Sequence, residues 1–302
     1  MKMNYIKRRK TFFLISLAVI VICIVMMFVN YFNGKGILNY DIEFSGGSII
    51  HLDITKEFDV QTQILPLVIE YLGDSSAVIQ TIPDTYQVLI TTKTTDATLR
   101  TDFVDHVQEE FGLEGNIILA EDSFSPTISS ELQSTAMSAV VLASVLMLIY
   151  IWVRFKDFKF GAAAVIALVH DVLIMMCVYV VFRIPVNYSF IAAILTIIGY
   201  SINDTIIVFD RIRENKRVIG GSDEVVINTS ISQTLTRSIN TSITTLIMVA
   251  SLNIFGTPSV REFAFPLVVG VISGTYSSIF IASPVWFELR KVAKFFHKKA
   301  TT

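Results

Sequence analysis

Long apolar runs dominate the chain and predict membrane-spanning helices, because a helix needs about 20 mostly apolar residues to cross a bilayer. The first run, 11–32, follows the basic residues Lys7–Lys10 and no small-x-small cleavage site follows it, which predicts an uncleaved signal anchor. The fifth run is the weakest, since its strictly apolar part is short, and a re-entrant or surface segment is the alternative there. The six predicted spans are 11–32, 136–153, 160–182, 188–209, 237–255 and 263–287.

Between the first two spans, residues 33–134 have the periodicities of a small folded domain. Residues 48–54 alternate as a strand does, and 60–72 have apolar residues at helical spacing. A hairpin, a second helix capped by Asp96 and a last strand follow, over 77–82 with 87–92, 96–111 and 116–120. The order strand–helix–strand–strand–helix–strand predicts a ferredoxin-like α+β domain built on a split βαβ unit.

The distribution of charge sets the topology. The chain has 302 residues, of which 53% are hydrophobic and 17% charged, below the roughly 25% typical of soluble domains. Its net charge of −2 is a cancellation, because 33–134 has a net charge of −13 and the remainder +11. This composition excludes a disordered, collagen-like or disulfide-stapled chain, and Cys23 and Cys177 both lie in apolar runs.

Basic residues concentrate in alternate segments: 1–10, 154–159, 210–236 and 288–302. The intervening loops, 183–187 and 256–262, have one basic residue each. Since basic loops stay in the cytoplasm, we expect both termini and the loop 210–236 to be cytoplasmic and 33–134 to be extracytoplasmic. The acidity of 33–134 indicates either a solvated face or a surface for a partner.

Ionisable residues within the predicted spans are candidate functional groups, because burying a charge in a membrane is costly. Asp204, next to Asn203, lies about 8 Å from the cytoplasmic end of the fourth span at ~1.5 Å per residue, and Arg237 begins the fifth at a similar depth. The similar depth of Asp204 and Arg237 predicts either a static ion pair or a pair that couples proton movement to helix movement. His170 and Asp171 lie mid-span in the third, as a proton relay or a hydrogen-bonded packing pair.

Other motifs constrain the function less. Gly270 and Gly274 form a GxxxG pattern in the sixth span, among many hydroxyl residues, which favours close packing on another helix. No P-loop, dinucleotide fingerprint or metal-ligand spacing is present in the sequence, so we expect neither ATP hydrolysis nor a metal or organic cofactor. The expected energy source is therefore a gradient or a partner.

Four stretches of the sequence resemble the SecF family of protein-export membrane subunits, within the SecD/SecF and resistance-nodulation-division group. The most specific is 196–214, which resembles the family's fourth-span signature. Residues 168–173 and 274–284 are similar to its third and sixth spans, and 41–47 to its start-of-ectodomain motif, with Asp41, Phe44, Gly46 and Gly47. The resemblance covers the whole chain in order, and implies a six-helix half of a pseudo-symmetric twelve-helix unit, with Gly199, Gly270 and Gly274 as helix-packing residues.

The resemblance also implies a function. Members pair with SecD, associate with the SecYEG channel, often with YajC and with an insertase, and use the proton motive force to promote polypeptide export and membrane-protein insertion at the bacterial plasma membrane. The family places Asp204 and Arg237, with Asn203, in the proton path, with protons as the coupling ion. It implies a transport subunit that is not an enzyme, with a translocating polypeptide and no nucleic acid as partner.

Two other functions fit the sequence less well. A lipid or drug exporter of the same superfamily has twelve spans and two large ectodomains, twice what this chain has. An intramembrane aspartyl protease would need Asp171 and Asp204 facing each other across one water. The two predicted depths differ, and the Gly-x-Gly-Asp pattern of that class is absent before Asp204.

Overall fold

The computed structural model describes residues 4–83, 85–155, 157–219 and 221–300. The chain forms two compact units, one of residues 40–137 and one of the remainder. Each unit has its own core, and each is described here by itself.

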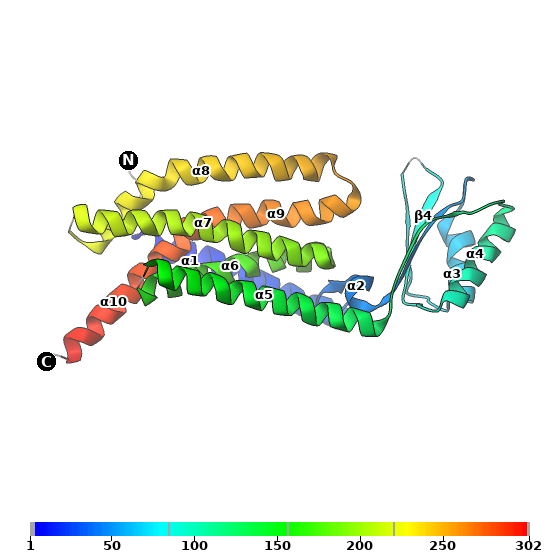
Figure 1. The fold of residues 1–302 in the computed structure, drawn as a ribbon, viewed down its shortest axis with the longest axis horizontal. Helices are drawn as coiled ribbons and strands as arrows, with labels where there is room; N and C mark the ends of the chain where they lie inside the picture. The colour runs from blue at the N-terminus through cyan, green and yellow to red at the C-terminus, as the bar shows by residue number, and fades with distance from the viewer. Residues whose placement is uncertain (1–3, 84, 156, 220, 301–302) are drawn as a thin grey trace. The chain divides into compact units, whose positions relative to one another are not determined.

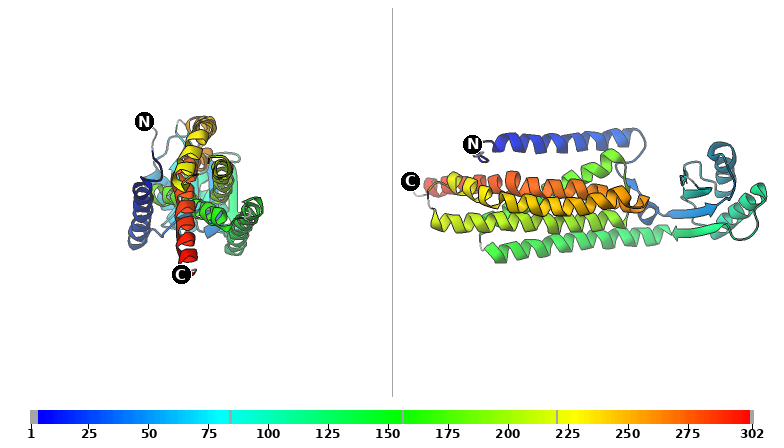
Figure 2. Two further views of the ribbon diagram at one scale, coloured as in Figure 1. Left: turned by 90° about the vertical axis from the view of Figure 1, so that its left-hand side faces the viewer. Right: turned by 90° about the horizontal axis from the view of Figure 1, so that it is seen from above.

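The larger unit is a helical bundle (Figures 1 and 2). Among the described residues, six helical segments are long and apolar enough to cross a membrane, as the sequence predicts. Helix α9 packs against α6, α7 and α8, which places it in the centre of the unit. The helices are α1 (Arg9–Phe32), α5 (Pro126–Phe155), α6 (Phe158–Phe182), α7 (Tyr188–Val218), α8 (Asp223–Phe255), α9 (Pro258–Ser277) and α10 (Ser283–Ala300), with two-residue strands β1 (Asn39–Tyr40) and β6 (Pro185–Val186).

Between α9 and α10 the helix widens into one π-helical segment, η2 (Ser278–Ala282). Pro284 follows directly and has no backbone N–H to donate into the preceding turn, which disturbs the regular α-helical ladder. The Ser283 hydroxyl donates to the Ser278 carbonyl at 3.1 Å. The last predicted span is therefore one helical segment with an internal change of pitch.

The helices continue beyond the predicted spans, and the prediction of a loop over 210–236 is wrong. Helix α7 runs to Val218, and α8 begins at Asp223, where the Ser222 hydroxyl accepts from the Val225 N–H at 3.4 Å. Charge excludes these residues from hydrocarbon but does not exclude them from a helix. Buried apolar residues at helical spacing, such as Ile227 and Ile231, keep this part of α8 packed on the bundle.

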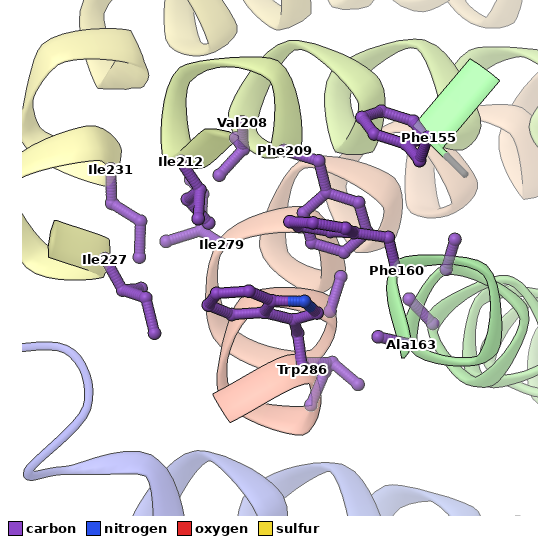
Figure 3. Packing of buried hydrophobic residues seen from close by; sticks show 14 of the residues in the cluster. Phe155, Phe160, Ala163, Val208, Phe209, Ile212, Ile227, Ile231, Ile279 and Trp286 are labelled. Carbon is purple, nitrogen blue, oxygen red and sulfur yellow. The ribbon is translucent and has the colours of Figure 1, made fainter. Parts of the chain in front are cut away.

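A dense aromatic core holds one end of the bundle together (Figure 3). The Trp286 indole of α10 is fully buried and stacks on Phe160 of α6 with ring centroids 4.7 Å apart. Phe209 of α7 contacts Phe160 at 4.9 Å and Phe155 of α5 at 5.9 Å. Aromatic clusters of this size bury large apolar areas, so α5, α6, α7 and α10 are fixed to one another here.

The smaller unit is an α+β domain. Its sheet has the antiparallel order β3–β4–β2–β5, and both long helices follow a strand, in the predicted element order. Alternate residues of β2 and β4, such as Ile50 and Ile90, are fully buried against helix residues such as Val68 and Phe103. Its elements are α2 (Ile42–Ser45), β2 (Gly47–Asp53), η1 (Val60–Ile64), α3 (Leu65–Leu72), β3 (Val78–Thr81), β4 (Gln87–Thr92), α4 (Ala97–Phe111) and β5 (Ile118–Phe124).

Candidate functional site

Asp171 lies at the centre of a polar cluster in the helical bundle. Its side chain is 1% exposed, and each carboxylate oxygen has two partners. Oδ1 accepts from the Ser273 hydroxyl at 2.6 Å and lies 3.0 Å from His170 Nδ1. Oδ2 accepts from the hydroxyls of Ser201 and Ser277, both at 2.5 Å. These bonds join α6 to α7 and α9, so the hydrogen-bonding capacity of this carboxylate is used in holding three helices together.

His170 extends the cluster to a fourth helix. Its Nε2 lies 2.9 Å from the Ser16 hydroxyl of α1, which in turn donates to the Tyr276 hydroxyl at 3.3 Å. The Tyr276 hydroxyl donates to the Phe12 carbonyl at 2.9 Å. The sequence identified His170 and Asp171, but it gave no sign of Ser16, because nothing in the local pattern of an apolar run tells which neighbour a single serine faces.

Asp204 of α7 is equally buried, at 1% exposure, but its surroundings are different. Within the described residues, neither of its carboxylate oxygens has a hydrogen-bond partner. The groups of α8 that act electrostatically on it are the Ser238 hydroxyl and the Arg237 guanidinium. A buried polar group without a partner is uncommon and needs an explanation. Asp171 and Asp204 share no hydrogen-bonding group in the described chain, which argues against the aspartyl-protease arrangement.

The predicted ion pair between Asp204 and Arg237 is not formed in this structure. Arg237 is exposed on the outer face of α8, and the buried position beside it is taken by Ser238. A polar pocket of about 370 Å³ adjoins the guanidinium between α7 and α8. The pocket is lined by Ile207, Asp210, Arg211, Glu214, Gln233, Thr234 and Arg237.

Two of the predicted packing glycines lie at close helix contacts. A Cβ added to Gly274 of α9 would lie 3.1 Å from the Ser201 Cβ, and one added to Gly270 would lie 2.4 Å from the Ile197 side chain. These glycines let α9 approach α7 closely enough for Ser201 and Ser273 to reach the same carboxylate. Gly199 makes no such contact among the described residues of this chain, because a Cβ there would meet nothing within 4 Å. Gly199 lies on the face of α7 that turns away from α9.

Comparison with known proteins gives the same family as the sequence motifs. The family model "Protein export membrane protein SecD/SecF, C-terminal" matches residues 107–292. The chain belongs to the SecD/SecF family of protein-export membrane proteins. It is 36% identical to the protein translocase subunit SecF of Petrotoga mobilis, over 96% of this chain and 97% of that one.

Fused members of the SecD/SecF family match a part of their length. The chain is 36% identical to the protein translocase subunit SecDF of Bacillus subtilis, over 96% of this chain and 39% of that one. The crystal structure of SecDF from Thermus thermophilus, described as a translocon-associated membrane protein, superposes with a TM-score of 0.81 at 31% identity, covering 96% of this chain and 39% of that chain. This chain is therefore a multi-pass membrane protein of the SecF type.

The start-of-ectodomain motif of this SecD/SecF chain forms a tight turn. Asp41 caps α2 by accepting from the Ile42 N–H at 2.8 Å, and Phe44 is buried. Gly46 and Gly47 have φ values of 79° and 141°, and a Cβ on Gly47 would lie 2.4 Å from the Thr92 carbonyl oxygen. Only glycine fits there, which explains the double glycine in backbone terms.

The α+β unit contains a buried carboxylate that the sequence analysis missed. Asp74 accepts from the Lys93 N–H at 2.8 Å, from the N–H and hydroxyl of Ser76 at 2.9 and 2.7 Å, and from the Thr92 hydroxyl at 3.0 Å. Burial raises the pKa of Asp74, but these four bonds outweigh it and lower the pKa to about 2. The signal in the sequence was the Asp-Ser-Ser turn after Gly73, which is common in loops and therefore weak.

Proposed function

We propose that this chain is the SecF-type subunit of a Sec protein translocase, and that with a SecD partner it uses the proton motive force to promote polypeptide export through SecYEG. The full-length similarity to proteins named SecF supports the translocase role. In the fused SecDF chains, the part that matches this chain accounts for about two fifths of the length, which supports a SecD part as its partner. YajC and an insertase are further partners in this proposal.

An exposed polar face on α7 and α8 supports a membrane partner. Asn203 on α7 and Arg237, Asn240 and Thr244 on α8 are all exposed, although both helices are apolar enough to span a membrane. Polar groups facing lipid are costly, so another protein surface or water must cover them. Gly199 lies on this same face of α7, where its lack of a side chain admits a close helix of the partner.

The observation that carries the proton-coupling part is Asp204. A carboxylate that is fully buried and has no hydrogen-bond donor is far less costly in its protonated form than in its ionised form. Its proton can therefore change the preferred arrangement of α7 and α8, with Arg237 as the nearby cation and Asn203 as its neighbour on the exposed side. Protons are the coupling ion, and the chain itself carries out no hydrolysis.

In this proposal both termini and the α7–α8 connection lie in the cytoplasm, as the positive-inside rule requires of their basic residues. Residues 33–134 then lie outside, where the acidic α+β domain contacts the translocating polypeptide or SecD. Deleting this domain should leave the helical bundle assembled and impair export. Crosslinkers placed on the domain that capture neither substrate nor partner would argue against this role.

The central experiment compares export with and without a proton gradient. Inverted membrane vesicles that contain the chain, its co-expressed SecD partner and SecYEG are prepared with wild-type or Asp204→Asn protein, and co-purification verifies that the complex is intact. We expect the Asn variant to assemble and to lose the stimulation of export by the proton gradient. Normal stimulation in that variant would falsify the proposed coupling, and failure of wild-type chain to co-purify with SecD would contradict the proposed partnership.

Arg237 gives a second test of the same proposal. Arg237→Lys keeps the positive charge and should retain part of the stimulation, whereas Arg237→Ala and Arg237→Glu should retain little. Equal stimulation in all three variants would show that the cation has no part in coupling.

A further inference from the structure

A stripe of four hydroxyl residues runs along the buried face of α8. Ser230, Thr234, Ser238 and Ser242 follow one another at four-residue spacing, and all are buried. Three of them donate to a carbonyl of their own helix, at distances of 2.7, 3.0 and 2.7 Å. The Ser238 hydroxyl is different, because it is fully buried and has no partner in the described part of the chain.

The residue facing this hydroxyl is Asp204, which also lacks a partner among the described residues. Hydrogen bonds join α7 to α8 on both sides of Asp204 and Ser238 along the helices. Asn215 donates to the Ser230 hydroxyl at 2.8 Å, and the Tyr200 hydroxyl donates to Ser242 at 3.1 Å. The unmade bond therefore involves one donor and one acceptor that lie beside each other between α7 and α8.

The two groups are chemically complementary. A serine hydroxyl can donate to an ionised carboxylate, and a hydrogen bond to a charged acceptor is stronger than one to the neutral carboxyl group. A change of the Ser238 side-chain rotamer, or a small rotation of α8 against α7, is the kind of movement that would bring the two groups into hydrogen-bonding geometry. Leaving it unmade costs free energy in both states of Asp204, and the cost is largest while the carboxylate is ionised.

We propose that Ser238 is a positioning residue for Asp204: its hydroxyl donates to the carboxylate when the proton has left, and the bond opens when the proton returns. The inference rests on the proposed proton-coupling role of Asp204 and names the group of this chain that holds its charged form. Making or breaking this bond changes how α8 is held against α7, so the bond links the protonation of Asp204 to the arrangement of the two helices.

Other charged or titratable groups also lie near Asp204, and the test must distinguish their influence on its protonation from that of Ser238. On α8 the nearest is Arg237, and on α6 they are His170 and Asp171, which reach the level of Ser201, one turn from Asp204. On α7 itself Asp210 pairs with Arg154 at 2.6 Å. Helix α9 and segment η2 bring no Asp, Glu, Lys, Arg or His between residues 263 and 282, only Tyr276.

The test measures how readily Asp204 reacts with a carbodiimide, which attacks protonated carboxyl groups. Membrane vesicles with the full chain and its SecD partner are treated with dicyclohexylcarbodiimide over a range of pH, and the labelled fraction of the peptide with Asp204 is measured by mass spectrometry. In Ser238→Ala, we expect labelling to persist to higher pH, by about one pH unit, the size of a lost hydrogen bond to a charged group. Ser238→Thr keeps the hydroxyl and should label as wild type does.

Ser232→Ala is the matched control, because its hydroxyl donates only to the Asn228 carbonyl of its own helix, at 2.9 Å. The proposal is overturned if Ser238→Ala labels as wild type does, if Ser238→Ala and Ser238→Thr shift equally, or if Ser232→Ala shifts as much. This outcome can be distinguished from that of the proposed function. If Asp204 of the wild-type chain labels with a pH midpoint but the Asp204→Asn variant keeps gradient-dependent export, the proposed coupling is refuted. The proposed contact between Ser238 and Asp204 is not refuted by that result.

Discussion

Two aspartates in neighbouring helices of the bundle have the same exposure and opposite surroundings. Asp171 of α6 is held by three serine hydroxyls and His170, whereas Asp204 of α7 has no partner among the described residues. Both are 1% exposed, so burial alone does not distinguish a structural carboxylate from a functional one. The difference lies in whether the surrounding donors already satisfy the group, because a satisfied carboxylate has nothing to gain from moving and an unsatisfied one does.

The largest effect is expected at Asp171. Asp171→Ala leaves buried hydroxyls on α7 and α9 and the His170 ring without their shared acceptor, so the free energy of unfolding should fall by about 3 kcal/mol or more. The measurement is thermal or denaturant unfolding of the purified chain in detergent. A variant as stable as wild type would show that this cluster is not what joins α6, α7 and α9.

The second largest loss of stability is expected where α9 closely approaches α7. Gly274→Val places side-chain atoms against Ser201, and overpacking of this kind costs about 1–3 kcal/mol. Gly199→Val is the control, because that position of the isolated chain is open. We expect the same unfolding assay to separate the two variants clearly, and equal losses would contradict the assignment of Gly274 to this helix contact.

Asp74 tests whether a carboxylate with all its hydrogen bonds made also stabilises the α+β unit. Its pKa of about 2 lies below the roughly 3.9 of an unfolded aspartate, so its contribution to stability is present above about pH 4 and is lost as the pH falls through 2. Asp74→Asn should therefore destabilise residues 40–137 by about 1–2 kcal/mol above pH 4, with the difference from wild type vanishing near pH 2.

The measurement for Asp74→Asn is the resistance of the full chain to pepsin as the pH falls from about 4 to about 2. Glu57→Gln is the control, because Glu57 is exposed. A difference that stays constant as the pH falls would mean that the ionised form of Asp74 is not the source of the stability.

The smallest change in stability is expected at Asp204. Asp204→Asn replaces a carboxyl group that makes no hydrogen bond in the described chain with a neutral amide of the same shape, so the free energy of unfolding should change by less than about 1 kcal/mol. A loss as large as that of Asp171→Ala would erase the contrast between the two aspartates.

Much of this picture could be predicted from the sequence. Apolar runs and loop charges predicted six spans, and strand and helix periodicities predicted the element order of residues 40–137. The aspartates were found because charge within an apolar run is rare. Local pattern could not show which helix faces which, so the serines around Asp171 and the outward direction of Arg237 came only from the packed structure. The sequence does not predict that α8 begins at Asp223, before Arg237, because charge limits how far a helix can lie in the membrane but does not limit the helix itself.

The measurement that bears most directly on the central claim is solid-state NMR of the chain with its SecD partner in lipid, with aspartate labelled with ¹³C at the side-chain carboxyl. The Asp204 signal is assigned by its loss in Asp204→Asn, and the Asp171 signal by its contacts to serine side chains. We predict that the Asp204 carbon shifts as the pH is varied across the range in which the protein stays folded, while the Asp171 carbon keeps its contacts to the serine side chains. A stationary Asp204 signal, or loss of the contacts between Asp171 and the serines over the same range, would contradict the claim that Asp204 exchanges a proton while Asp171 is held in place.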